Sequence, residues 1–422
     1  MGRLVGCAAL LLSVAVAVVW AEPLVPPDPT LRADLVAAEQ AAPAAVRSLI
    51  DQVRGASLPD RLAAMLKLRA MGTEATGAVL ALTELLWGES ADSLVLDMPP
   101  TQLRQAEVAA FALAGLGARS TGPLTLALTS DSDLARDSVL RALRSQNPQW
   151  MRSDAALAEV PALTEQLTHP RSNVRRAAAK ALGLLGDGRA LAPLSLLLTS
   201  ATEALEVRLT VAQAMAALSH PDVATKLAAA LTDPEPTLRL AVTEALGQRR
   251  PLPSGALLRA LDDADAPVRA AAVSALRYAS GTDVVLAVAA RLHDADRRVR
   301  EMAAVTLGDL RDASALEPLL GALADPARAV REEAIFALGR IGDKRAVPKL
   351  IFTAQDEDPR IRELSARALG RFRDRAAAET LVLLLDDEPN VSQAALSSLE
   401  TLSGEKRGKT RAEWEAWLKG WR

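Results

Sequence analysis

The sequence repeats itself from residue 161 to residue 402 with a period of roughly 30 residues, within the range of known repeat architectures. Each copy carries an apolar residue followed by Arg, and most copies carry a triplet similar to Ala-Leu-Gly that ends eight residues after that Arg. The apolar-Arg pairs are Val174-Arg175, Val207-Arg208, Leu238-Arg239, Val268-Arg269, Val299-Arg300, Val330-Arg331 and Ile361-Arg362, with Val391-Ser392 as a degenerate copy. A fixed period of this length predicts a stack of supersecondary units, in which each unit buries its apolar face against its neighbours.

The composition indicates that these units are helical. Half of the residues are hydrophobic, but only 3% are aromatic, and runs of β-branched residues are few. Ala and Leu dominate, and both favour helices that pack closely. We therefore predict an all-α protein, an α-solenoid (superhelix) of stacked helix pairs.

The repeats resemble those of a known family. The segment from Val174 to Leu194 reads VRRAAAKALGLLGDGRALAPL. It resembles HEAT repeats, and more closely the short HEAT-like repeats of the phycobilisome bilin lyases. The resemblance is strong over residues 161–402 and weaker over residues 57–150. It implies a stack of helix pairs but no particular function, because such repeats occur in enzymes, transport factors and assembly scaffolds.

The chain divides into five segments by pattern. We expect a signal peptide at residues 1–21, a Pro-rich tether with N-terminal helices at 22–56, degenerate HEAT-like repeats at 57–160, regular HEAT-like repeats at 161–402, and a Trp-rich capping helix at 403–422. Within the degenerate part, the turn-rich stretch 87–100 is expected to be a long loop. The final segment is similar to the tails of other exported bacterial HEAT proteins.

The N-terminus has the pattern of an export signal. Arg3 is followed by an unbroken apolar stretch from Leu4 to Val19, and Val19-Trp20-Ala21 offers small residues where signal peptidase requires them. The alternative is an uncleaved N-terminal membrane anchor, since the stretch is close to the shortest that can span a bilayer. We expect a periplasmic or secreted protein without cysteine, because Cys7 is the sole cysteine and lies in the signal.

In five repeats an Asp lies six residues before the Arg of the apolar-Arg pair. The pairs are Asp233/Arg239, Asp263/Arg269, Asp294/Arg300, Asp325/Arg331 and Asp356/Arg362. They could form a row of acid–base or ion-binding sites. Five equivalent copies fit a structural ladder better, in which Asp accepts hydrogen bonds in its turn and Arg bridges adjacent layers.

Signals for catalysis or cofactor binding are weak. The sequence has three histidines, His169, His220 and His293, in separate repeats, and it has no phosphate-binding or nucleophile motif. We therefore predict no catalytic, metal-binding or cofactor-binding residues and no enzyme activity. The alternative of a bilin-lyase-like enzyme, or an enzyme accessory built on HEAT-like repeats, stays open.

The charge balance bears on the partner. The chain holds 49 Lys and Arg against 52 Asp and Glu, for a net charge of −3. Nucleic-acid binding, including a DNA-glycosylase-like function, is disfavoured because it requires a markedly basic face. We expect a monomeric scaffold that binds another protein on the concave face of the solenoid.

Two groups of residues are candidates for that contact. Arg340, Arg367 and Arg371 lie on or just after expected second helices and would form a basic stripe on the concave face. Trp414, Trp417 and Trp421 share one face of the last helix. They would form either an exposed aromatic platform or, more simply, a cap that closes the stack.

The signal pattern makes a direct prediction about processing. If Ala21 ends the signal, the mature chain begins at Glu22. Intact-mass spectrometry of the exported protein should show loss of residues 1–21. Retention of those residues would identify the segment as a membrane anchor.

Overall fold

The computed structural model describes residues 29–55, 57–87, 94–98, 101–404, 408 and 410–421. The expected signal peptide and most of the Pro-rich tether lie outside these residues. The chain forms two compact units with the boundary between Ala181 and Leu182. Each unit consists of helix pairs, so the predicted all-α class and the stacking of helix pairs are confirmed. In the described part of the chain, no helix has the length and apolar character needed to cross a membrane.

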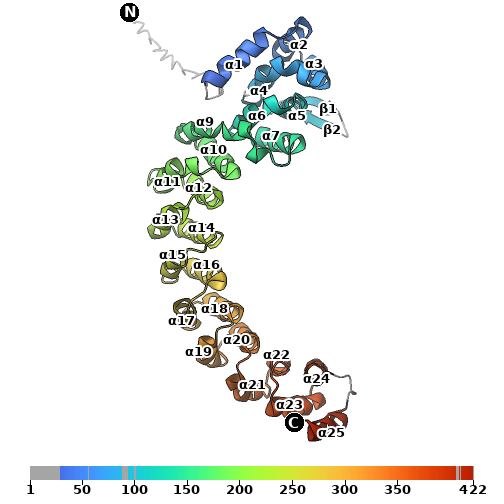
Figure 1. The fold of residues 1–422 in the computed structure, drawn as a ribbon, viewed down its shortest axis with the longest axis vertical. Coiled ribbons are helices and arrows are strands. Elements are labelled where there is room, and N and C mark those ends of the chain that lie inside the picture. The colour runs from blue at the N-terminus through green and yellow to red at the C-terminus, as the bar shows by residue number, and fades with distance from the viewer. Residues whose placement is uncertain are drawn as a thin grey trace, which may run out of the picture. The chain divides into compact units, whose positions relative to one another are not determined.

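The first unit contains short and irregular helix pairs (Figure 1). Its helices are α1 (Pro29–Gln40), α2 (Ala44–Gly55), α3 (Leu58–Met71), α4 (Val79–Trp87), α5 (Gln105–Gly115), α6 (Thr121–Ala127), α7 (Asp133–Gln146), α8 (Asp154–Leu157) and α9 (Val160–Glu165), and α10 (Ser172–Leu185) crosses the boundary between the units. Apolar side chains from successive helices, such as Ile50, Leu68 and Leu113, are buried between them.

A β-hairpin interrupts the first unit where a loop was expected. Strands β1 (Leu94–Met98) and β2 (Thr101–Arg104) pair antiparallel, with Met98 opposite Thr101 and Leu96 opposite Leu103. The expectation of a loop throughout residues 87–100 is wrong for β1. The short apolar run Leu94-Val95-Leu96 favours a strand, and the turn-forming residues on both sides of it obscured this signal.

The second unit is a regular row of helix pairs, arranged as a layer of first helices and a layer of second helices (Figure 1). The first helices are α11 (Leu191–Leu198), α13 (Val223–Ala228), α15 (Ser254–Ala260), α17 (Thr282–Ala290), α19 (Leu316–Ala322), α21 (Val347–Thr353) and α23 (Arg375–Leu383). The second helices are α12 (Leu205–Ala217), α14 (Pro236–Gly247), α16 (Ala266–Ala275), α18 (Arg297–Leu310), α20 (Arg328–Ile341), α22 (Pro359–Leu369) and α24 (Pro389–Ser403), and α25 (Arg411–Gly420) ends the chain.

Helix boundaries in the second unit follow from capping residues. The Asp358 side chain accepts the Arg360 backbone N–H at the start of α22, and Pro359 occupies the first helical position, as the sequence predicts. Gly342 ends α20 with φ of 74°, in the left-handed region that glycine tolerates without a steric penalty. Each turn between helices is therefore specified locally.

Glycine sets the distance between consecutive second helices. A Cβ placed on Gly308 would lie only 2.9 Å from Cα and 3.0 Å from Cβ of Ala337 on the next second helix. Gly339 faces Ala368 in the same way, and Gly370 faces Ser398. In α24 the equivalent position, one repeat after Gly370, is Glu400. Ala216 in α12 and Arg277 just after α16 also occupy this position, so glycine is not required at every approach.

This close approach predicts opposite effects for two glycines of neighbouring repeats. Gly308→Ala should lower the free energy of unfolding by about 1–3 kcal/mol, because the new methyl group meets the backbone of α20. Gly321→Ala should raise it by roughly 0.5–1 kcal/mol, because Gly321 lies in the exposed part of helix α19 with no atom within 4 Å of its Cβ position. Urea unfolding followed by circular dichroism would measure both. Equal effects of the two substitutions would contradict this account of the helix spacing.

Candidate partner-binding surface

The ladder arginines make ion pairs between neighbouring repeats. Arg239 donates from Nε and Nη2 to the carboxylate of Asp263 at 2.7 and 2.8 Å, and Arg269 does the same to Asp294 at 2.8 and 2.7 Å. The pattern recurs at Arg300–Asp325 and Arg362–Asp387. Each Arg therefore clamps the next repeat with two parallel hydrogen bonds, the strong geometry for a guanidinium and a carboxylate.

The Asp that precedes each Arg by six residues is contacted through its backbone. Arg269 Nη1 donates to the carbonyl oxygen of Asp263 at 2.9 Å, while the Asp263 carboxylate accepts from Arg239 and from the backbone N–H of Asp265 at 2.8 Å. The hydrogen bond from Arg239 lowers the pKa of Asp263. The Asp263 carboxylate is thus ionised, nearly buried and occupied by hydrogen-bond donors, which leaves it no role as a general base.

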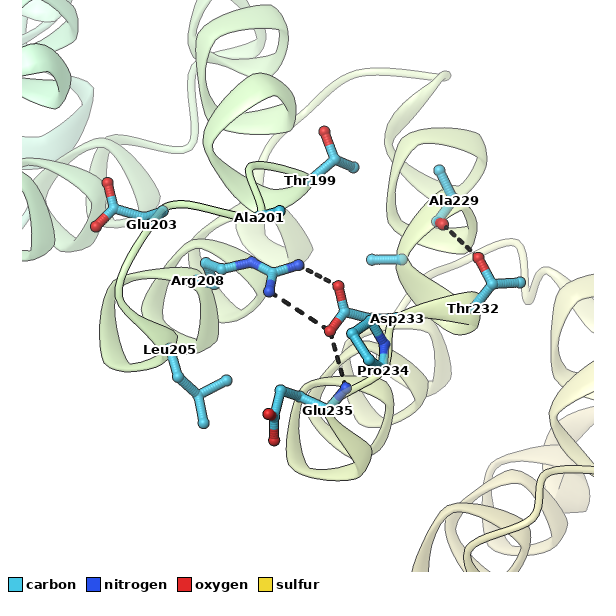
Figure 2. A pocket seen from close by; sticks show the side chains of 11 residues that line it. Thr199, Ala201, Glu203, Leu205, Arg208, Ala229, Thr232, Asp233, Pro234 and Glu235 are labelled. Atoms are coloured by element: carbon cyan, nitrogen blue, oxygen red, sulfur yellow. Dashed lines mark hydrogen bonds and ion pairs between the residues drawn. The ribbon is translucent and has the colours of Figure 1, made fainter.

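Arg208 makes an ion pair of the same kind. Its repeat follows the preceding one at the longest interval between successive apolar-Arg pairs. Arg208 is 5% exposed, and its guanidinium donates to the Leu198 carbonyl oxygen at 2.8 Å and to the Asp233 carboxylate. Figure 2 shows this pair among the residues that line a cavity of about 480 Å³. Because Arg208 and Asp233 satisfy each other, they form no unpaired charge that would indicate a ligand.

The ladder lacks one ion pair. Arg331 donates to the carbonyl oxygens of Asp325 and Pro326, as its counterparts do in their own turns. Within the described residues, however, no ion pair joins Arg331 to Asp356, whose carboxylate accepts from the Asp358 N–H at 2.9 Å. Arg328 connects these two repeats instead, through an ion pair of 3.2 Å with Asp358.

The histidines lie in turns. Nδ1 of His169 accepts the Arg171 N–H at 3.1 Å, and Nδ1 of His220 accepts the Asp222 N–H at 3.2 Å. In the part of the chain that the structure describes, no cluster of His, Cys, Asp and Glu side chains could hold a metal ion.

The three arginines expected to form a basic stripe differ in their surroundings. Arg340 on α20 makes an ion pair of 2.6 Å with Asp309 on α18. Arg367 on α22 pairs with Glu363 at 2.6 Å, and its side chain stays 59% exposed. Arg371 follows α22, is exposed, and has no ion-pair partner among the described residues. The structure therefore brings Arg367 and Arg371 together at one groove. Arg340 and Arg367 are both ion-paired, but the Arg367 side chain is the more exposed of the two, at 59% against 37%.

Arg367 and Arg371 line a groove between α22 and α24. The groove has a volume of about 540 Å³, and its remaining polar side chains include Gln393, Ser397 and Thr401. No acidic side chain lines it. It is the part of the second-helix layer best suited to a negatively charged group.

Sequence reasoning missed Phe336, which lies beside this groove. Phe336 is 39% exposed on α20, at the position one repeat before Arg367. Equivalent positions of successive repeats lie in rows, so the repeat period could have placed Phe336 next to Arg367. Glu333 is on the same helix, where burial, followed by the nearby carboxylates of Glu301 and Glu332, raises its pKa.

The three C-terminal tryptophans form one cluster. Trp414 is fully buried, and its indole N–H donates to the Gly408 carbonyl oxygen at 3.2 Å. Trp417 meets it edge-on at a centroid distance of 5.4 Å, and Trp421, just beyond the helix end, stacks on Trp417 at 4.8 Å. Helix α25 packs against α23. The burial of Trp414 favours a cap on the first-helix layer over an exposed platform.

These features define the class of the protein as an α-solenoid built from repeated helix pairs. The HEAT repeat profile matches residues 121–206, 253–331 and 316–400, more than half of the chain. The chain belongs to the HEAT-repeat family. No curated protein sequence matches it.

Solved structures with a similar fold are distant in sequence. The Kap95:Nup1 complex matches at a TM-score of 0.52 with 16% identity, over 86% of this chain and 56% of that one. Kap95p in its complex with RanGDP matches at 0.51, with 16% identity over 86% and 55%. The Escherichia coli protein YibA matches at 0.43, with 21% identity over 58% and 92%. The chain spans about half the length of the Kap95 chains, and the likeness concerns the fold alone.

The ladder geometry predicts unequal effects for two equivalent aspartates. Asp294→Ala should lower the free energy of unfolding by about 1–3 kcal/mol, because it leaves both Arg269 and the Asp296 N–H without their acceptor. Asp356→Ala should cost less than half as much, since it removes a turn hydrogen bond alone. Urea titration of both variants measures the difference. Equal losses would show that the Arg–Asp bridge adds no stability.

Proposed function

We propose that this protein is an exported scaffold that binds another protein along the second-helix layer of its second unit. The observation that carries the proposal is the character of that layer between α18 and α24. It presents Phe336 next to two exposed arginines, Arg367 and Arg371, in a chain that is otherwise poor in aromatic residues. Exposed aromatic and Arg side chains are typical of protein–protein contacts.

The packing of the second helices supports this choice of surface. Glycines such as Gly308, Gly339 and Gly370 let consecutive second helices approach closely. Closer spacing on one side of a stack curves it toward that side, so the second-helix layer is the expected concave face. Concave faces of repeat stacks offer extended binding surfaces. The fold-level likeness to Kap95, whose solved structures include complexes with RanGDP and Nup1, agrees with a protein partner.

We further propose that the protein acts in the periplasm or outside the cell as a monomer. The support is the signal-like segment 1–21, and the alternative is retention of that segment as a membrane anchor. Repeat solenoids of this class commonly act without catalysis, and the Arg–Asp ladder of the second unit is accounted for by packing between repeats. An enzyme or enzyme accessory therefore has no specific support.

Affinity capture with surface variants tests the function. A variant of the second-helix layer, Phe336→Ala with Arg371→Glu, should lose the protein that the wild-type chain captures from the cell envelope. The matched control changes the first-helix layer at Phe352→Ala with Arg345→Glu, where Phe352 is 73% exposed, and it should retain the captured protein. Loss of the captured protein in the control variant alone would show that the first helices form the binding surface. Capture that neither variant affects would contradict the proposal.

A further inference from the structure

We propose that the groove between α22 and α24 anchors a carboxylate side chain of an extended, acidic partner segment, and that Phe336 receives an apolar side chain of the same segment. This inference rests on the proposed function and specifies the chemistry of the partner. Its first support is the charge around the groove. Arg360 and Arg367 share the Glu363 carboxylate at 3.0 and 2.6 Å, and Arg371 has no ion-pair partner in the described part of the chain.

These four side chains leave an excess of positive charge beside the groove. Arg360 and Arg367 pair with the same carboxylate, and Arg371 has no ion-pair partner among the described residues, so the three guanidinium groups outnumber the one carboxylate. The Glu363 side chain is 9% exposed and holds the Arg367 guanidinium in place. A preorganised cation loses less conformational entropy on binding. The groove also offers the hydroxyl group of Ser397 and the amide of Gln393 as hydrogen-bond donors.

The position of Arg371 is constrained by a neighbouring helix. A Cβ placed on Gly339 at the end of α20 would lie 3.4 Å from Cδ of Arg371, so the stem of Arg371 runs against that glycine. Its charged end is then free to reach the groove. Arg340, at the equivalent position one repeat earlier, cannot substitute, because Asp309 already holds it at 2.6 Å. Acid recognition is thereby limited to the last two second helices.

Phe336 sets the spacing of the recognised segment. It occupies the same helical position as Arg367, one repeat earlier, on the preceding second helix. Packed helices are about 9 Å apart, and an extended chain advances about 3.3 Å per residue. If an acidic residue of the partner segment lies in the groove, a residue about three positions away in that segment lies against Phe336. The recognised segment should therefore carry an acidic and an apolar side chain about three residues apart.

The neighbouring surface disfavours a long polyanion. Beyond Phe336 the second-helix layer carries Glu301 and Glu333, and burial with the adjacent carboxylates raises the pKa of Glu333. A nucleic acid that followed the second-helix layer would meet these acidic side chains directly after the arginines of the groove. A peptide segment with one acidic stretch and one apolar side chain fits both parts of the surface.

Selection from a phage-displayed library of random twelve-residue peptides on the full-length mature chain tests the inference. We expect enrichment of peptides in which Asp or Glu stands about three residues from Leu, Phe or Trp. Synthetic copies of these peptides should bind the Arg367→Gln/Arg371→Gln variant at least tenfold more weakly, with the largest difference at low salt. The Arg189→Gln/Arg345→Gln variant makes the same charge change at two exposed turns and should bind like the wild type.

Three results would overturn the proposal. In the first, the selection enriches peptides without acidic residues, or enriches no peptide at all. In the second, acidic peptides bind both double variants equally well. In the third, a twelve-nucleotide single-stranded DNA of mixed sequence displaces the peptides. Circular dichroism on each variant confirms that the fold is retained. If the captured partner depends on the second-helix layer while the peptides fail, the proposed function stands and this inference falls.

Discussion

The structure of the second unit depends on the close approach of consecutive second helices. Several of these approaches are made possible by glycine, as at Gly308 against Ala337, and most are secured at the helix start by an arginine that clamps the next repeat, as in Arg269 with Asp294. Solenoid repeats bury their apolar faces against their neighbours alone. The close helix approach and the arginine clamp therefore hold consecutive repeats of the second unit together.

The same periodicity separates structural from variable positions. The clamp position is Arg in all the repeats but the last, whereas the position of Arg371 is occupied one, two and three repeats earlier by Arg340, Asp309 and Tyr278. Those side chains project from the second-helix layer at regular intervals and contribute little to packing. Their variation is what distinguishes one stretch of the surface from another, and it places the positive charge of the groove at the end of α22.

The fold could be predicted from the sequence because its signals are repeated. The apolar-Arg pairs, the triplet glycines and caps such as Asp358 each report on a local contact that recurs in every repeat, so the all-α stack followed directly. The hairpin at Leu94–Met98 was missed because a single short apolar run between turn residues carries no periodic support. The site was only partly predictable. Arg340 and Arg371 are equivalent in sequence, and the ion pair that neutralises Arg340 depends on Asp309 from another repeat.

The central claim is that the second-helix layer near the C-terminus contacts the partner protein. Hydrogen–deuterium exchange of the chain, measured alone and with its captured partner, tests this claim most directly, because binding suppresses local opening of the helices it contacts. The account predicts added protection in α20, α22 and α24, with α19, α21 and α23 unchanged. Protection confined to the first helices, or to the first unit, would contradict it.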